Sequence, residues 1–543
     1  MLDLSMHRLE LLNSAQEYAE RMRLRRNLLF YAMIAVLLVS FSTFVILRVA
    51  APHMLDLAPV LTISVLICLA LPVIIWMQPR AGLYILCFCA CLFLQNPSDA
   101  HHDPFEVIPF FWNISTIGQF YGKTNALNAF HFNLGEGVML TTFLFWMMRQ
   151  ILLRDVKLTK GTCFWSFVVF IGFCGFAFVR GVTSGGDITM ALWEVRALFY
   201  FFFAYLMATN LIVTREHALT LLFLIMLGIG AKSIFGTINY IKNPNVSIEE
   251  GVLSHEDSLL MNIIILGSLI FWLAKEEPIL KWCFTIFTPL AVATSLANGR
   301  RAGIACLILA FPVVLMLCYA LLQKRRKALG AFITVFTIAA SIYMPIAWNG
   351  QGVWALPARA IRSHSSPDER DAASDNYRLA ENQNLKLTRD MSPWIGYGYG
   401  RPYIEAYYMP GRMDVFKLIL PHNGILWMWM RLGHFGFIAF WFFVLSMLVY
   451  GAQSLKKVTD MRLVAMGILG LATLLMLLMY GEYDLNFANY RTMWITGTLL
   501  GIVGVIPFLE KRQNNTKQTL NKEEETEEEF ANVRSLPNPD SLF

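Results

Sequence analysis

Apolar residues occur along most of the chain in blocks of about 20, separated by short polar breaks. The blocks are uniformly apolar and do not alternate with a period of two, which favours membrane-spanning helices over the strands of an outer-membrane barrel. The pattern therefore predicts an all-α integral membrane protein with about fourteen transmembrane helices. The expected spans are 28–47, 57–76, 81–95, 134–150, 163–179, 193–213, 217–238, 258–274, 280–297, 302–322, 329–348, 423–450, 463–481 and 492–509.

The polar breaks set the direction in which the chain threads the bilayer. With the N-terminus in the cytoplasm, the strong basic clusters, among them Lys324–Lys327 and Lys456/Lys457, fall on the inner side, as the positive-inside rule requires. Both termini are then cytoplasmic. The expected regions are a cytoplasmic amphipathic segment (1–26), a first transmembrane part (27–348), a large, partly helical periplasmic loop (349–421), a last transmembrane part (422–509) and a disordered acidic cytoplasmic tail (510–543).

The segment 349–421 is the longest polar interruption and falls on the outer side. Loops of this length are usually either functional or disordered. The aromatic and glycine-rich stretch Trp394-Ile-Gly-Tyr-Gly-Tyr-Gly400 favours order, so we expect a folded cap.

Composition narrows the classes of function. Of 543 residues 56% are hydrophobic, and the net charge of +6 is scattered over short loops, which reflects membrane topology and not nucleic-acid binding. The nine Cys residues all fall within apolar blocks, so no disulfide framework is indicated. The run Cys87-Phe-Cys-Ala-Cys91 has the form of a metal ligand set, but Cys in an apolar helix usually serves as a small hydrophobe, and we predict no metal site.

Several arginines are predicted at the outer mouth of the spans, where cations are disfavoured: Arg180, Arg196, Arg300, Arg301 and Arg491. One explanation is an anionic ligand, because guanidinium groups bind phosphate oxygens bidentately and stay charged. The adjacent pair Arg300-Arg301 has no acidic residue nearby in sequence and is the strongest candidate. The alternative is pairing with local carboxylates: Arg196 with Glu194 or Asp187, and Arg491 with Asp484 or Glu482.

His422 directly follows the long loop and opens a predicted span. A histidine at this outer mouth is able to exchange a proton near neutral pH. The alternative is an interfacial histidine bonded to a backbone carbonyl. Arg431 and His434 lie on the same predicted helix, too far along it to contact His422.

Four local motifs follow one another along the chain: Trp193-Glu-Val-Arg196, Asn298-Gly-Arg-Arg-Ala-Gly303, Trp394-Ile-Gly-Tyr-Gly-Tyr-Gly400, and His422-Asn-Gly-Ile-Leu426 running into Leu432-Gly-His-Phe-Gly436. In this order they resemble the O-antigen ligase and O-antigen polymerase superfamily of bacterial membrane glycosyltransferases. Two departures stand out: Arg300 occupies a position where members often have Ser, and Arg431 stands where they often carry an acidic residue.

The resemblance implies an inverting, metal-independent glycosyl transfer on the periplasmic side of the bacterial inner membrane, without a cofactor. The donor is an undecaprenyl-diphosphate-linked glycan, and the acceptor is a glycan or lipid A-core. Membrane lipid and other polysaccharide assembly proteins are expected partners, in O-antigen, capsule or exopolysaccharide biosynthesis. The expected site residues are His422 and Arg301 for catalysis, Arg196, Arg300, Arg301 and Arg378 for the diphosphate, and Tyr397, Tyr399 and Tyr403 for sugar stacking, with an interfacial aromatic belt as the alternative for the tyrosines.

Three hypotheses compete with this one. The first is a transporter or flippase for lipid-linked glycans, which would carry charges deep in the membrane, and Lys232 is the clearest of these. The second is a structural scaffold, in which outer-face arginines beside a histidine would have little function. Within the superfamily the large cap and Arg431 favour polymerase over ligase. A metal-dependent oligosaccharyltransferase needs an acidic early outer loop, for which the candidates are Asp99, His101, His102, Asp103 and Glu106.

Overall fold

A computed structural model gives the fold. It describes residues 22, 28–36, 39, 69–95, 105, 108–116, 131–154, 157–242, 251–350, 352–363, 366, 369–409 and 416–534, with backbone only for 370, 371 and 516–534. The chain divides into two compact units. The first comprises 1–89 with 93–157, and the second 90–92 with 158–543.

The first unit contains most of α3 (Pro79–Leu92) and all of α6 (Leu134–Leu152). α6 begins with a reciprocal capping box, in which Asn133 Oδ1 accepts the amide of Glu136 and Glu136 Oε2 accepts the amide of Asn133, each at 2.9 Å. Most of the predicted spans 28–47 and 57–76, the segment 1–26 and the acidic early loop lie outside the described residues.

The second unit holds ten helices that are long and apolar enough to cross a membrane. They correspond one to one with the ten spans predicted between 163 and 509, and the described residues form no named strand, so the all-α membrane class is confirmed. The count of fourteen spans is not. The ten are α7 (Phe164–Thr183), α8 (Ile188–Leu211), α9 (Arg215–Lys242), α10 (Asp257–Ala274), α11 (Pro278–Ala297), α12 (Arg301–Leu321), α13 (Arg326–Ala347), α16 (Gly424–Leu455), α17 (Met461–Gly481) and α18 (Tyr490–Arg534).

The core of this unit is built on α17 and α18, whose apolar windows are each 89% buried. α18 packs most extensively on α8, because glycines let the two backbones approach. A Cβ at Gly497 would lie 2.3 Å from the carbonyl oxygen of Phe201, and one at Gly501 would lie 2.5 Å from Ala208 Cβ. By contrast α13 buries only 6% of its window and leaves its apolar side chains for lipid.

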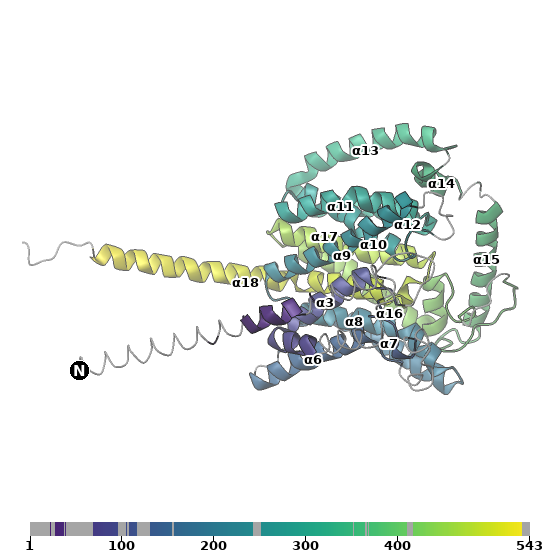
Figure 1. The fold of residues 1–543 in the computed structure, drawn as a ribbon, viewed down its shortest axis with the longest axis horizontal. Helices are drawn as coiled ribbons and strands as arrows, with labels where there is room; N and C mark the ends of the chain where they lie inside the picture. The colour runs from purple at the N-terminus through teal and green to yellow at the C-terminus, as the bar shows by residue number, and fades with distance from the viewer. Residues whose placement is uncertain are drawn as a thin grey trace, which may run out of the picture. The chain divides into compact units, whose positions relative to one another are not determined.

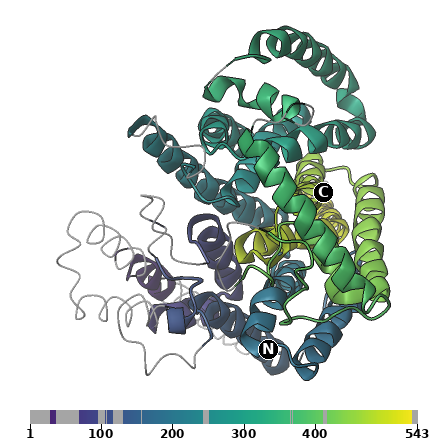
Figure 2. The ribbon, with the colours of Figure 1, turned by 90° about the vertical axis from the view of Figure 1, so that its right-hand side faces the viewer.

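The segment between α13 and α16, which we call the cap, contains η3 (Val353–Ala355), α14 (Leu356–Arg362) and α15 (Glu369–Asp390). α15 is polar and stands across the direction of the membrane-spanning helices of its unit (Figure 1), over their ends (Figure 2). The described part of the loop predicted at 349–421 is thus partly helical and ordered.

α18 does not end near 509. It continues to Arg534, so the start of the tail predicted as disordered is helical, while 535–543 lie outside the described residues. The sequence from Lys511 onward is rich in Glu, Lys and Gln, which are strong helix formers even when there is no apolar face to bury. Low hydrophobicity was therefore a poor guide to disorder in a segment that extends an existing helix.

Candidate active site

The connections α9–α10, α11–α12 and α17–α18 meet at one end of the second unit. Asn298, in the α11–α12 turn, accepts the amide of Leu253 at 3.0 Å. Tyr480 at the end of α17 donates to the carbonyl of His255 at 2.9 Å, and Asn489 before α18 donates to Glu256 at 2.7 Å. These are the connections that the threading placed together on the outer side.

A cavity of about 500 Å³ lies at this end, between the first turns of α12, the helices α14 and α15 of the cap, and the end of α17. We call it the arginine cavity, because four arginines line it. Its other polar walls come from the α9–α10 and α17–α18 connections. The lining includes Arg300, Arg301, Arg359, Arg378, His255, Ser363, Asp375, Tyr480, Tyr483, Asp484, Ile304, Ile308 and Leu309.

Arg300 and Arg301 stand where α12 begins, so their charges add to the positive end of the helix dipole. Arg300 is the N-cap residue, and its side chain makes no cap hydrogen bond. Arg301 reaches the cap through long contacts, 3.5 Å to the carboxylate of Asp375 and 3.4 Å to Ser363 Oγ. Because the Asp375 side chain is 48% exposed, this pair is weak and easily exchanged for a ligand anion.

The wall facing the arginines carries a histidine–carboxylate pair. His255 Nδ1 lies 3.6 Å from Asp484 Oδ2. Burial acts to raise the pKa of Asp484, but the hydrogen bond and charge of His255, the charge of His422 and the Leu485 amide outweigh it, so the pKa lies below its usual value. Asp484 is therefore ionised, and it lies within electrostatic reach of both histidines.

His422 does not line the cavity, although its charge acts on Asp484, which does. The wholly buried carboxylate of Glu381 lies 3.1 Å from Nδ1 of the His422 ring and fixes its orientation. The same carboxylate also accepts a hydrogen bond from the backbone amide of His422 at 2.8 Å. The ring of Tyr377 meets it edge-on. This geometry replaces the backbone-carbonyl partner considered from sequence and leaves Nε2 as the ring nitrogen that Glu381 does not engage.

A break in α16 fixes the cap to the bundle. Gly433 has φ +68° and ψ −174°, a conformation open to glycine alone, and it interrupts the helix. The cap supplies partners for the backbone groups that the break leaves without helical hydrogen bonds. The backbone amide of Tyr397 donates to the carbonyl of Met430 at 2.8 Å, and the backbone amide of His434 donates to the carbonyl of Pro393 at 2.7 Å. The glycine-rich motifs at 394–400 and 432–436, both identified from the sequence, therefore contact each other at the break in α16.

An ion pair between Arg431 and Glu194, both wholly buried, stabilises this contact between the cap and α16. Arg431 Nε donates to Glu194 at 2.6 Å, and its guanidinium also donates to the carbonyls of Gly398 and Arg401 at 2.9 and 2.7 Å. Glu194 accepts from Trp427 as well, at 2.8 Å. The unusual charge of Arg431 is thus explained by structure, because it neutralises a buried glutamate.

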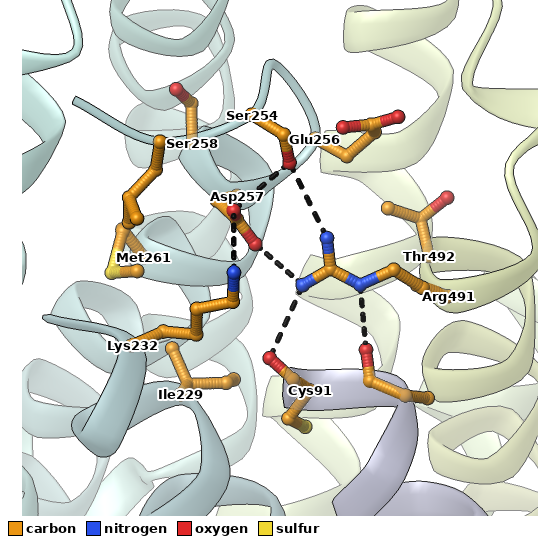
Figure 3. Close-up of polar contacts among 12 residues, drawn as sticks. Cys91, Ile229, Lys232, Ser254, Glu256, Asp257, Ser258, Met261, Arg491 and Thr492 are labelled. Atoms are coloured by element: carbon orange, nitrogen blue, oxygen red, sulfur yellow. Dashed lines mark hydrogen bonds and ion pairs between the residues drawn. The ribbon is translucent and has the colours of Figure 1, made fainter. Parts of the chain in front are cut away.

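Arg491 belongs to a different environment, shown in Figure 3. Its guanidinium pairs with Asp257, donates to the carbonyl oxygens of Ala90 and Cys91, and lies 3.4 Å from Ser254 Oγ. Lys232 approaches the same carboxylate at 3.6 Å, and all three charged side chains are 0% exposed. We call Lys232, Asp257 and Arg491 the Asp257 cluster. Neither predicted partner of Arg491, Asp484 or Glu482, is the one that binds it.

The structure brings Arg300, Arg301 and Arg378 together and leaves Arg196 and Arg180 out of the cavity lining. Arg196 is 9% exposed and lies 6.0 Å from the ring of Tyr490. Its predicted partner Glu194 is occupied by Arg431.

The three tyrosines predicted to stack on sugars divide into two kinds. Tyr399 and Tyr403 are 0% and 1% exposed, and the Tyr403 hydroxyl donates to the carbonyl of Lys417 at 2.8 Å. Neither ring offers a face to a sugar, so we remove both from the site as parts of the cap core. Tyr397 is half-buried, and the Arg401 guanidinium lies over its ring at 3.8 Å.

Sequence reasoning missed Glu381, His255 and Arg359. Glu381 sits in a helix rich in charged residues, where nothing marks the one carboxylate that turns inward. His255 was open to detection, because Ser254-His-Glu-Asp257 is a polar cluster that opens a span on the predicted outer side.

Long apolar helices, an ordered polar cap and an arginine-lined cavity at one end of the bundle define a multi-pass membrane protein with a site under its cap. Residues 284–441 match the family model described as O-antigen ligase, which supports the resemblance to the O-antigen ligase and polymerase superfamily that the motifs predicted. The match includes Arg300, Arg301, Arg378 and His422. It supports a membrane glycosyltransferase of the O-antigen ligase or polymerase type. A comparison with curated proteins found no match.

Proposed function

We propose that the protein transfers undecaprenyl-diphosphate-linked glycans on the periplasmic side of the inner membrane, in surface polysaccharide biosynthesis. The observation that carries this is the arginine cavity, in which Arg300, Arg301, Arg359 and Arg378 share one space with apolar side chains of α12. A polyprenyl diphosphate needs both surfaces, cations for its charged group and a lateral apolar wall for its tail.

The apolar wall continues toward lipid. Ile308 and Leu309 line the cavity and are 39% and 48% exposed, so a chain leaving the cavity along α12 stays on an apolar surface. The neighbouring α13 is almost wholly exposed and does not close that side. The diphosphate then lies at the N-terminus of α12, where the helix dipole and the arginines reinforce one another.

The reaction consists of one displacement at the anomeric carbon. The acceptor hydroxyl oxygen forms the new glycosidic bond as the bond from that carbon to the diphosphate oxygen breaks, with inversion, and undecaprenyl diphosphate leaves with the bonding electron pair. The hydroxyl proton passes to His422 Nε2, a contribution of about 10²–10⁴-fold for general-base help. The arginines stabilise the charge that develops on the departing diphosphate, which requires no metal in this scheme.

Glu381 fits this assignment, because its carboxylate on Nδ1 orients the ring and stabilises the imidazolium that forms during transfer. Asp484, ionised beside His255 and within the electrostatic reach of His422, adds negative charge to the cavity.

The acceptor is a glycan chain or lipid A-core, and we favour polymerase over ligase. The ordered cap supports this preference, because it gives a growing chain a surface outside the membrane. Arg431 no longer bears on the choice, since it pairs with Glu194 and not with an acceptor. Tyr397 remains the sugar-stacking candidate, and other polysaccharide assembly proteins are expected partners.

The transporter alternative loses its main support. It rested on Lys232 as a charge deep in a span, and Lys232 shares the buried carboxylate of Asp257 with Arg491. A charge held in this way is a structural element and not an obvious step in a transport pathway.

The test is transfer by the purified full chain supplied with lipid-linked repeat units, lipid A-core and a protein acceptor. Chains that lengthen on the polyprenyl carrier identify a polymerase, glycan on lipid A-core a ligase, and glycan on protein an oligosaccharyltransferase. His422→Ala is the inactive control, checked for folding by its unfolding temperature. An assay in chelator examines metal independence, and activity restored by a divalent ion would contradict it. Full transfer by a His422→Ala/Arg301→Ala double variant would overturn the site.

A further inference from the structure

A second cavity, of about 730 Å³, lies at the opposite end of the second unit. Its walls are the first turn of α7, the last turns of α16, and α18 around Pro507. This end also carries the Arg215–Asp460 and Arg462–Glu277 ion pairs, at 3.1 and 2.6 Å. The threading places it on the cytoplasmic side, where anionic lipids concentrate.

Two lysines, Lys160 and Lys457, line this cavity and are both exposed. The carboxylate that also lines it, Glu510, is engaged with Thr459, whose hydroxyl donates to Glu510 Oε1 at 2.6 Å. The N-terminus of α7 adds the partial positive charge of the helix dipole, and Cys163 provides no side-chain cap there. The cavity therefore has an excess of positive charge beside hydroxyl groups.

The rim of the same cavity is apolar and aromatic. Trp165, Phe442 and Tyr450 line it and are 63%, 59% and 56% exposed, and the Lys160 ammonium lies 4.8 Å from the Trp165 ring. Aromatic side chains of this kind belong to the headgroup level of a bilayer, with their apolar faces against acyl chains. A small soluble anion would leave these apolar side chains uncovered, whereas the acyl chains of a lipid would cover them.

We propose that this cavity binds one anionic phospholipid, with the phosphodiester between Lys160 and Lys457 and the acyl chains along Phe442 and Trp165. The bound lipid joins α7, α16 and α18 at their cytoplasmic ends. Because it binds the folded bundle alone, it raises the unfolding temperature of the protein. The proposal is independent of the transfer reaction, whose cavity is at the other end.

The test uses the full chain in neutral detergent, with bound lipid measured by native mass spectrometry and stability by thermal unfolding. The wild type is expected to retain phosphatidylglycerol over phosphatidylcholine and to unfold at a higher temperature with it. The double variant Lys160→Gln/Lys457→Gln should bind phosphatidylglycerol about 25-fold more weakly, from about fivefold for each lysine near the headgroup. Its unfolding temperature in phosphatidylcholine should not change, because both lysines are exposed.

Lys456→Gln is the matched control, since Lys456 is an exposed neighbour of the same charge that does not line the cavity. It should bind phosphatidylglycerol as the wild type does. Equal binding by the double variant and the wild type, or an equal loss in Lys456→Gln, would overturn the site. Inorganic phosphate that reproduces the thermal shift would replace the lipid with a free anion and also overturn the proposal.

Discussion

The Asp257 cluster and the arginine cavity use the same kind of cations, at the same end of the bundle, in opposite surroundings. In the cluster, Arg491 and Lys232 meet one carboxylate, and every charged group is 0% exposed. In the cavity, four arginines share an open space, and the carboxylate beside Arg301 is 48% exposed. The first arrangement is closed around its own carboxylate, whereas the second surrounds an open space with four arginines.

Threading a chain through a bilayer therefore predicts the side on which a cation lies, but it does not predict the role of that cation. Role depends on whether a carboxylate from another helix neutralises the charge. The partner of Arg491 is 234 positions away in sequence, so no local pattern shows it. We therefore expect substitutions in the Asp257 cluster to impair folding, and substitutions in the arginine cavity to impair glycan transfer.

The largest expected effect is on the cluster. Asp257→Asn leaves Lys232 and Arg491 buried without their carboxylate, and should lower the free energy of unfolding by about 3–5 kcal/mol. Thermal unfolding in detergent measures it, with Asp375→Asn as the control, because the Asp375 pair is exposed and should change stability by less than about 1 kcal/mol. Equal stability of the two variants would contradict the distinction between the regions.

The next effect is on the cavity. Arg301→Ala should reduce transfer by about 10²–10³-fold, the loss typical of one donor to transition-state charge, while it leaves the unfolding temperature close to that of the wild type. Arg326→Ala is a suitable control. Arg326 is an exposed arginine at the start of α13, and it lies beside Tyr319 at the end of α12 far from the cavity. A loss of stability that matched the loss of transfer would move Arg301 into the structural class.

Sequence predicted much of the fold, because twenty-residue apolar blocks have few alternatives in lipid. It also singled out Arg300 and Arg301, whose charge is unusual for the predicted outer side, and the family resemblance added Arg378; all three line the arginine cavity. It did not predict that Tyr399 and Tyr403 are core residues or that Glu194 pairs with Arg431. Those outcomes depend on how the cap folds against the break at Gly433, which brings residues together from three separate segments.

The third effect concerns the carboxylate behind His422. Glu381→Gln keeps an acceptor for the His422 amide but no longer stabilises a protonated ring, so kcat should fall on the order of tenfold, part of the general-base contribution, with the donor KM unchanged. Combined with His422→Ala it should cause no further loss, because Glu381 acts through the histidine. Additive losses would indicate a role in folding the cap. Glu405→Gln, a cap carboxylate paired with Lys417 at 2.7 Å, is the control.

The smallest effect tests the wall opposite the arginines. The pKa of Asp484 lies below its usual value, so its ionised form stabilises the fold above the unfolded-state pKa of about 3.9, and that stabilisation is lost as the pH falls through the lower folded value. Asp484→Asn should therefore cost at most about 1 kcal/mol at neutral pH, since His255 is more than half exposed. The difference from the wild type should shrink below about pH 4, where the wild type begins to take up the proton. A difference that stays constant down to the acid limit would mean that Asp484 acts by shape and not by charge, and the two regions would then differ less in electrostatics than their geometry indicates.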